Sequence, residues 1–315
     1  MGFASAPARI VFVLLALAAG VPASAQDYGD TPYVQTPQNV VDTMLKLARV
    51  GANDYVIDLG SGDGRMVITA AKRYGARGFG VDIDRRLVDL SNANAAKAGV
   101  ADRAAFYMRD LHETDFRRAT VLTLYLLPEV NLMIRPRLLD TLKPGTRIVS
   151  HDYGMGRWSP DYQTEIEAPG KTVGAVKTSK ILYWMVPGNA AGRWLWTLER
   201  AGKKQAFELS LEQMFQKLTG KMMVGGRPVE LQRASLEGDR ITVTAVDGKG
   251  PSTVHYEFSG RIINHAIEGQ VRVETEGKGR ELPWHAARIE AWDPRHYALR
   301  AMPPCKEMGG PCAGQ

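Results

Sequence analysis

The sequence predicts an α/β fold: a doubly wound, Rossmann-like domain with a mostly parallel sheet, followed by a smaller antiparallel β-barrel or sandwich. Apolar segments alternate with amphipathic helical segments between residues 40 and 152, as in a parallel sheet. The segment 55–59 runs into a glycine-rich turn that opens a helix. After residue 192 short alternating strands are separated by glycine-containing turns. The 315 residues suffice for two such domains.

The N-terminal domain begins with a predicted helix over 40–50, where apolar residues recur at helical spacing. Two strand-like stretches within 163–187 predict an antiparallel hairpin at the sheet edge. Right-handed crossovers would make the fold doubly wound. The remaining predicted strands are 55–59, 78–82, 104–108, 120–127 and 146–152, and the helices are 65–74, 85–98 and 129–142, the last interrupted by Pro136.

The predicted division assigns residues 26–187 to the first domain, 188–302 to the antiparallel β-domain and 303–315 to a flexible tail. Alternating apolar residues and turns such as Gly225-Gly226 indicate the β-domain. Its tryptophans can line a ligand cavity, or they can form the core, which is the commoner use of alternating aromatic residues. These tryptophans are Trp194, Trp196, Trp284 and Trp292.

Residues 1–25 are typical of a secretory signal peptide. Arg9 precedes a short apolar run, and Ala23-Ser24-Ala25 fits a cleavage site. The run is shorter than the roughly 20 residues of a membrane-spanning helix, so no span is expected after cleavage. We therefore expect an exported protein, periplasmic or secreted. If the signal is not used, the protein is cytoplasmic.

The only two cysteines, Cys305 and Cys312, lie in the tail. In an oxidising compartment they can close one small disulfide loop, although free thiols fit the sequence equally. Their spacing matches neither a redox motif nor a zinc site, so we expect no metal. Lys and Arg residues are interspersed with acidic ones despite a net charge of +6, which predicts no nucleic-acid partner.

The most informative stretch is D-x-G-x-G-x-G, with Asp58 at a strand end and Gly60, Ser61, Gly62 and Gly64 in the turn. Glycine tolerates positive φ and lets the backbone approach a ligand, so we expect the turn to present its amides and the helix N-terminus. A dinucleotide fingerprint would need another glycine where arginine stands. A carboxylate at the strand end suits the ammonium group of S-adenosylmethionine, which carries no phosphate.

Two more aspartates follow the next strands. Asp82 is placed to accept hydrogen bonds from both ribose hydroxyls, and Asp110 lies where an adenine amino group would sit. Taken alone, each of these aspartates would be better explained as a helix cap or turn residue. Together with the glycine turn they predict S-adenosylmethionine as the cofactor.

On these residues the stretch 27–187 resembles the class I S-adenosylmethionine-dependent methyltransferases. The segment from Tyr33 to Pro37, followed by the glycine motif, resembles the protein-lysine methyltransferases of mitochondrial carriers and ATP synthase, and more distantly the seven-strand histone-lysine enzymes. The resemblance implies that Tyr33 and Thr36 bind the cofactor, whereas an N-cap role would also suit Thr36 before a proline. Those enzymes usually carry glutamate at the position of Asp82 and lack the β-domain, which leaves the acceptor open.

Three residues are candidates for catalysis. Methyl transfer needs an aligned, desolvated nucleophile, and an amine must be neutral to attack. Tyr125 and Glu129 flank the end of the fourth strand, and His151 ends the fifth, where it can act near neutral pH. Alternatively, Glu129 stabilises its helix as a first-turn acid and His151 is a satisfied residue at the domain interface.

The sequence therefore predicts a methyltransferase acting on an unidentified protein or small-molecule acceptor, with a protein lysine amine as one candidate. The alternative is an exported, non-catalytic protein whose degenerate methyltransferase core binds a nucleoside-like ligand or a partner, because a fold does not guarantee an activity.

Overall fold

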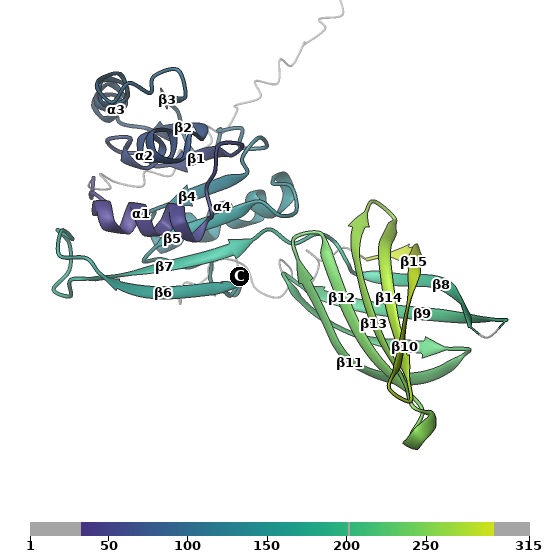
Figure 1. Cartoon of the computed structure of the whole chain (residues 1–315). Helices are drawn as coiled ribbons and strands as arrows, with labels where there is room; N and C mark the ends of the chain where they lie inside the picture. Colours follow the sequence, from purple (N-terminus) through teal and green to yellow (C-terminus); the bar gives the residue numbers. More distant parts are fainter. Residues whose placement is uncertain (1–32, 201, 293–315) are drawn as a thin grey trace, which may run out of the picture. The chain divides into compact units, whose positions relative to one another are not determined.

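The computed structural model describes residues 33–200 and 202–292. These residues form a seven-stranded sheet with helices and a closed eight-stranded barrel (Figure 1). The predicted signal peptide and the tail with Cys305 and Cys312 lie outside the described residues. Within the described part, no helix combines the length and apolar character needed to cross a membrane.

The sheet has the strand order β3-β2-β1-β4-β5-β7-β6. Neighbours from β3 to β5 pair in parallel, whereas β7 is antiparallel to both β5 and β6. The strands are β1 (Tyr55–Leu59), β2 (Arg77–Asp82), β3 (Ala104–Met108), β4 (Val121–Leu124), β5 (Arg147–His151), β6 (Tyr162–Glu167) and β7 (Thr178–Met185). The α/β class and the mostly parallel sheet are confirmed.

The predicted antiparallel hairpin is present, with its second strand inserted inside the sheet. β7 lies between β5 and β6, so β6 forms the edge. Ile181 and Trp184 in β7 are fully buried, whereas no residue of β6 is. A strand that carries large apolar side chains is stabilised by neighbours on both sides, and the polar strand remains at the edge.

Helices cover both faces of the sheet. Val40, Met44 and Leu45 of α1 pack in one cluster with Val56 of β1 and Val149 of β5. The helix α4 contributes Ile134 and Leu138 to a cluster with Ile57 and Leu122, which belong to the other face. The helices are α1 (Gln38–Leu47), α2 (Arg65–Tyr74), α3 (Arg85–Lys97) and α4 (Pro128–Thr141).

Two predicted boundaries around α4 were wrong. The strand β4 ends at Leu124 rather than 127, because the chain turns out of the sheet before Pro128, the first residue of α4. The helix was expected to break at Pro136 but continues to Thr141. Buried Ile134 and Leu138 flank the proline, and their packing outweighs its unfavourable helix propensity.

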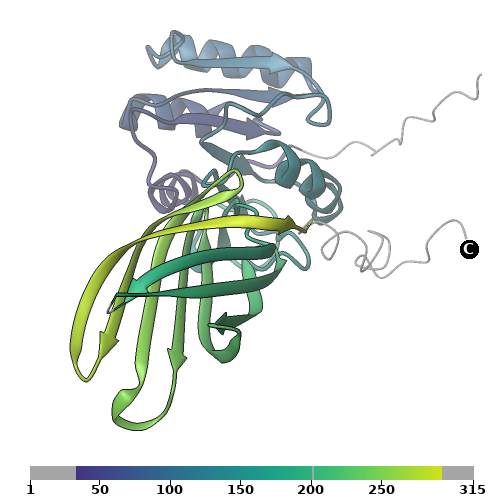
Figure 2. The same cartoon turned by 90° about the vertical axis from the view of Figure 1, so that its right-hand side faces the viewer.

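The second body is a barrel rather than a sandwich. Its strands pair antiparallel in chain order, and β15 closes the ring on β8 (Figure 2). Alternate side chains along each strand face a common apolar interior. The strands are β8 (Gly192–Arg200), β9 (Lys203–Met214), β10 (Lys217–Val224), β11 (Arg227–Glu237), β12 (Arg240–Asp247), β13 (Val254–Ile263), β14 (Ala266–Thr275) and β15 (Lys278–Ala291), with a 3₁₀ turn at Gly250–Ser252.

Candidate cofactor site

The turn after β1 requires glycine at three positions. Gly60, Gly62 and Gly64 have φ angles of 77°, 54° and 83°, in the left-handed region. A Cβ on Gly60 would lie 2.9 Å from Leu126, and one on Gly64 would lie 2.7 Å from the Phe106 ring. At Gly60 and Gly64 any larger residue would be strained and would displace a neighbour, so the turn is closely packed against the rest of the domain.

The amides of this turn are used inside the protein, which corrects the expectation that they face the ligand. Gly60 and Ser61 both donate to the Val81 carbonyl at 2.9 Å, and Gly64 donates to the Ser61 carbonyl at 2.9 Å. Gly62 donates to the Asp82 carboxylate at 2.9 Å. A phosphate would compete for these donors. A cofactor without phosphate leaves them undisturbed.

Asp82 ends β2 and fastens the glycine turn. One carboxylate oxygen accepts the Gly62 amide and the other accepts the Asp84 amide at 3.0 Å. Each oxygen keeps a further lone pair, so the ribose role predicted for Asp82 stays sterically and chemically available. The next residue, Ile83, is 73% exposed and was not singled out from the sequence.

Asp58 is buried beside the turn. Its carboxylate accepts a 2.6 Å hydrogen bond from the Thr123 hydroxyl on β4. Burial raises the pKa of Asp58 to about 7; the Thr123 hydrogen bond opposes the shift, and the nearby Asp82 and Asp63 carboxylates add to it. A cationic ligand group at this carboxylate would favour its ionised form. The residue therefore fits the ammonium group of S-adenosylmethionine.

Ser61 and Asp110, both predicted to bind the cofactor, differ in burial: Ser61 is buried and Asp110 is exposed. The Ser61 side chain turns back towards β2, where a Cβ on Gly80 would lie 2.4 Å from it. Its buried hydroxyl has no hydrogen-bond partner among the residues that the structure describes. Asp110 is exposed after β3, and one of its oxygens accepts the His112 amide at 2.7 Å. The turn role is thus observed for Asp110, and its adenine role remains a prediction.

The segment before α1 is tied to the glycine turn by Arg65. This guanidinium donates to the Thr36 carbonyl at 2.7 Å and pairs with Asp63 at 2.6 Å. Neither Arg65 nor Asp63 was singled out as a site residue from the sequence, although Asp63 lies within the glycine motif and Arg65 directly follows it. Thr36 is not an N-cap, because Pro37 takes that position without a side-chain hydrogen bond. Tyr33 is 42% exposed, and its cofactor role stays a prediction.

His151 is fully buried, and both ring nitrogens are engaged. Nδ1 lies 3.3 Å from the Thr36 hydroxyl and Nε2 lies 2.8 Å from the Ser179 hydroxyl. Burial lowers the pKa of His151 to about 4, against the opposing effect of the Asp152 carboxylate. A neutral imidazole without a vacant nitrogen cannot take a proton from an acceptor. The geometry favours a positioning role and argues against the predicted proton transfer.

Tyr125 and Glu129 lie at the edge where β4 gives way to α4. The Tyr125 ring packs on the His151 ring, with centroids 3.9 Å apart. Burial raises the pKa of Tyr125 to about 12, so the phenol stays protonated at neutral pH. Glu129 is an exposed acid in the first turn of α4. Tyr125 can therefore donate a hydrogen bond, and Glu129 can accept one from a cationic acceptor.

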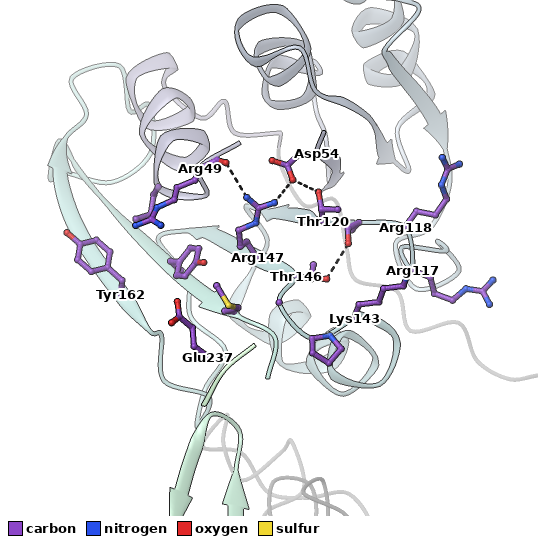
Figure 3. A pocket seen from close by; sticks show the side chains of 16 residues that line it. Arg49, Asp54, Arg117, Arg118, Thr120, Lys143, Thr146, Arg147, Tyr162 and Glu237 are labelled. Atoms are coloured by element: carbon purple, nitrogen blue, oxygen red, sulfur yellow. Dashed lines mark hydrogen bonds and ion pairs between the residues drawn. The ribbon is translucent and has the colours of Figure 1, made fainter. Parts of the chain in front are cut away.

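A separate pocket of about 870 Å³ lies at the amino ends of β4 and β5 (Figure 3). Its lining includes five Lys or Arg side chains. Three of these make internal contacts: Arg147 pairs with Asp54, Arg117 pairs with Asp115, and Arg118 lies over the Tyr55 ring at 4.5 Å. The glycine turn follows the carboxyl end of β1, so this pocket is not part of the cofactor site. Among residues 33–200 and 202–292, no three His, Cys, Asp or Glu side chains gather as metal ligands.

The sheet order, the glycine turn and the acidic strand ends together define an S-adenosylmethionine-dependent methyltransferase. The ANTKMT methyltransferase domain matches residues 58–162. A protein-lysine N-methyltransferase of Saccharolobus islandicus is 44% identical over 137 residues, which cover 43% of this chain and 85% of that relative. The chain belongs to the ANTKMT methyltransferase family.

Vertebrate relatives match a similar share of the chain. A mouse lysine N-methyltransferase named for ATP synthase is 31% identical over 42% of this chain and 53% of its own length. The mouse adenine nucleotide translocase lysine N-methyltransferase is 32% identical over 41% of this chain and 56% of its own length. The chain thus spans little more than half of these two relatives.

Solved structures are similar to up to about half of the chain. An RNA methyltransferase from Salinibacter ruber in complex with S-adenosylhomocysteine is 49% identical, covering 49% of this chain and 94% of that chain with a TM-score of 0.45. A methyltransferase from Geobacter sulfurreducens with the same ligand is 25% identical, covering 42% of this chain and 51% of that chain with a TM-score of 0.34.

Proposed function

We propose that this methyltransferase is a protein-lysine N-methyltransferase. The observation that carries the proposal is the archaeal relative of that name, which is 44% identical and is covered by this chain over 85% of its length. The vertebrate relatives named for lysine methylation of ATP synthase and of the adenine nucleotide translocase support the same acceptor class.

The residues at the carboxyl edge of the sheet have the chemistry that this reaction needs. The lysine ammonium first loses a proton, which in this proposal Glu129 receives. The neutral nitrogen then attacks the methyl carbon in line; the C–N bond forms as the C–S bond breaks, which gives a methylammonium and the neutral thioether S-adenosylhomocysteine. Tyr125, protonated at neutral pH, is a hydrogen-bond donor at the same edge of the sheet. Asp58 and Asp82 hold the two ends of the cofactor.

The cofactor site is tested by calorimetric titration with S-adenosylmethionine and S-adenosylhomocysteine. We expect Asp82→Ala to weaken both ligands by at least about 10-fold, because it removes the ribose acceptor and releases the Gly62 amide. Asp89→Ala is the matched control, since Asp89 is exposed on α3 in a pair with Arg85. Equal affinities for the wild type and Asp82→Ala would contradict the site. No binding by the folded wild type would favour the degenerate core.

The acceptor is tested with methyl-labelled cofactor and peptides that contain a single lysine. Matched peptides carry arginine in place of that lysine, and RNA is offered in parallel. Label on the lysine nitrogen, seen by mass spectrometry and reduced in Glu129→Gln, is the expected result. Label in RNA, or equal label in the arginine peptides, would overturn the lysine proposal while leaving the cofactor site intact.

We also propose export, supported by the charged start, apolar run and Ala23-Ser24-Ala25 of the leader. The test is the N-terminal sequence of the protein recovered from cell fractions. A chain that begins at Gln26 in the periplasm or medium is expected. An uncut chain in the cytoplasm would refute export and would give the enzyme direct access to its cofactor.

A further inference from the structure

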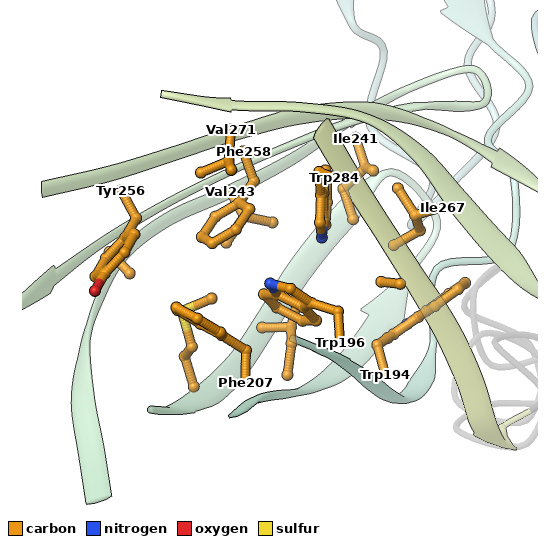
Figure 4. Close-up of a cluster of buried hydrophobic side chains, with 14 of the residues drawn as sticks. Trp194, Trp196, Phe207, Ile241, Val243, Tyr256, Phe258, Ile267, Val271 and Trp284 are labelled. Atoms are coloured by element: carbon orange, nitrogen blue, oxygen red, sulfur yellow. The ribbon is translucent and has the colours of Figure 1, made fainter. Parts of the chain in front are cut away.

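The barrel interior is lined mostly by large aromatic side chains. Trp196 stacks on Phe207 with centroids 5.3 Å apart, and Trp284 lies 5.0 Å from Phe258. Trp196 and Trp284 meet edge to face, 5.7 Å apart and inclined by 65° (Figure 4). All four side chains are at most 5% exposed. Such an interior offers flat apolar faces and few polar groups.

One interior tryptophan has its polar atom satisfied. The Trp194 indole donates to the Ala190 carbonyl at 2.9 Å, and the Arg288 guanidinium lies 4.3 Å above its ring. The hydrogen bond of Trp194 is therefore complete within the barrel itself. Trp194 serves as the reference with which the hydrogen bonding of the other two indoles is compared.

Trp196 and Trp284 differ from Trp194 in this respect. They are 5% and 1% exposed, and neither Nε1 atom finds a hydrogen-bond acceptor within 33–200 and 202–292. Figure 4 shows both indole nitrogens inside the barrel among the aromatic side chains. A buried donor without a partner costs free energy, and two such donors double that cost. An acceptor placed there would remove it.

We infer that the barrel binds a small, neutral, largely apolar ligand whose single carbonyl-type oxygen accepts hydrogen bonds from Trp196 and Trp284. A carbonyl oxygen has two lone pairs and can serve both donors. The side chains around the two indoles are aromatic or aliphatic, so a neutral oxygen avoids the cost of burying a charge among them. The interior of a closed eight-stranded barrel is either filled by its own side chains or holds one small ligand, so this proposal is of a size that the architecture allows.

Two other accounts of the indole groups make different predictions. One internal water could accept both hydrogen bonds, or each N–H could point at an aromatic face and recover part of a hydrogen bond. In both cases the barrel needs no ligand, and an added carbonyl compound gains nothing from the two indoles. The ligand proposal alone predicts that affinity depends on the ligand's oxygen and on both Nε1 atoms.

The first experiment uses the full-length protein and Prodan, a neutral fluorescent ketone. We expect Prodan to bind with blue-shifted emission and to be displaced by acetophenone. α-Methylstyrene, which replaces the ketone oxygen of acetophenone with a methylene group, should displace it at least about 10-fold more weakly. No binding of either ketone to the folded protein, or equal displacement by the two competitors, would overturn the proposal.

The second experiment uses Trp196→Phe, Trp284→Phe and the double variant, which remove the donors but keep aromatic rings. Each single variant should weaken acetophenone binding by about 5-fold or more, and the double variant should remove its advantage over α-methylstyrene. Trp292→Phe is the control, because that indole donates to Glu290. Thermal unfolding and near-ultraviolet circular dichroism report whether each barrel is folded. Undiminished binding in the folded variants would refute the site.

Discussion

The Thr123 hydroxyl donates a 2.6 Å hydrogen bond to the Asp58 carboxylate, and both side chains are buried. The bond joins neighbouring strands β4 and β1 at the edge where the cofactor is proposed to bind. It opposes the effect of burial, which nevertheless holds the pKa of Asp58 at about 7. A carboxylate that titrates near neutrality makes cofactor binding sensitive to pH.

We predict that affinity for S-adenosylmethionine falls as the pH drops through 7. Asp58 is ionised above its pKa of about 7 and neutral below it, and only the ionised form attracts the cofactor ammonium. Calorimetry should show binding about 10-fold weaker at pH 6 than on the plateau above pH 8. Thr123→Val should shift this transition to higher pH, and Asp58→Asn should abolish it. The same affinity at pH 6 and pH 8 would contradict the assignment.

Gly64→Ala should destabilise the protein more than Gly99→Ala does. Both glycines have positive φ, 83° and 71°, so both substitutions carry backbone strain of about 1–2 kcal/mol. Only at Gly64 would the new Cβ meet other atoms, 2.7 Å from Phe106 and 2.8 Å from Ser91. This overlap should cost about 1–3 kcal/mol more. Urea unfolding of the two variants measures the difference, and equal losses would show that the turn can relax.

His151 should make the fold less stable in acid. Its pKa is about 4 in the folded protein and 6.5 when unfolded, so the unfolded chain binds the proton more readily. Stability is therefore full above pH 6.5 and declines as the pH falls towards 4. The difference in unfolding free energy between the wild type and His151→Asn should shrink over this interval. A difference that does not change with pH would show that His151 is not held neutral.

Asp54→Ala should weaken the amino edge of the sheet. Asp54 pairs with Arg147 and also accepts hydrogen bonds from Thr120 at 2.7 Å and the Gly51 amide at 2.8 Å. The side chains of Arg147 and Asp54 are 19% and 13% exposed, so the variant leaves a mostly buried guanidinium without its carboxylate. We expect a loss of about 3 kcal/mol in thermal or chemical unfolding.

The matched control is Asp115→Ala, which breaks an exposed pair with Arg117. Exposed pairs contribute little because solvent screens them, so this variant should unfold like the wild type. If Asp54→Ala also left the free energy of unfolding unchanged, solvent would have to reach Arg147 more freely than its burial indicates.

Local patterns in the sequence were sufficient to predict the strand ends that carry Asp58 and Asp82 and the glycine turn that follows β1. Their spacing reflects a strand followed by a helix, which is a property of neighbouring residues. The insertion of β7 beside β5 was not predictable in this way, because strand order depends on which faces are buried in the whole sheet. The same holds for His151, whose partners Thr36 and Ser179 are distant in sequence.

Residues that act through the backbone were the hardest to predict. Arg65 holds the segment before α1 by donating to the Thr36 carbonyl. Every residue has a backbone carbonyl, so the sequence does not show which one accepts a hydrogen bond. The unsatisfied indoles of Trp196 and Trp284 were visible only as alternating aromatic residues, a pattern shared by any packed barrel. Hydrogen-bond satisfaction becomes apparent only once the surrounding strands are placed.

The pairing of β15 with β8 determines when the barrel can close during synthesis. The ribosome delivers β8 first and its partner β15 last, so the ring cannot close until almost the whole described chain has emerged. The seven-stranded sheet is complete at β7 and can fold earlier. A nascent chain that stalls before β15 would expose unpaired strand edges on β8 and β14. Such edges promote aggregation unless a chaperone covers them.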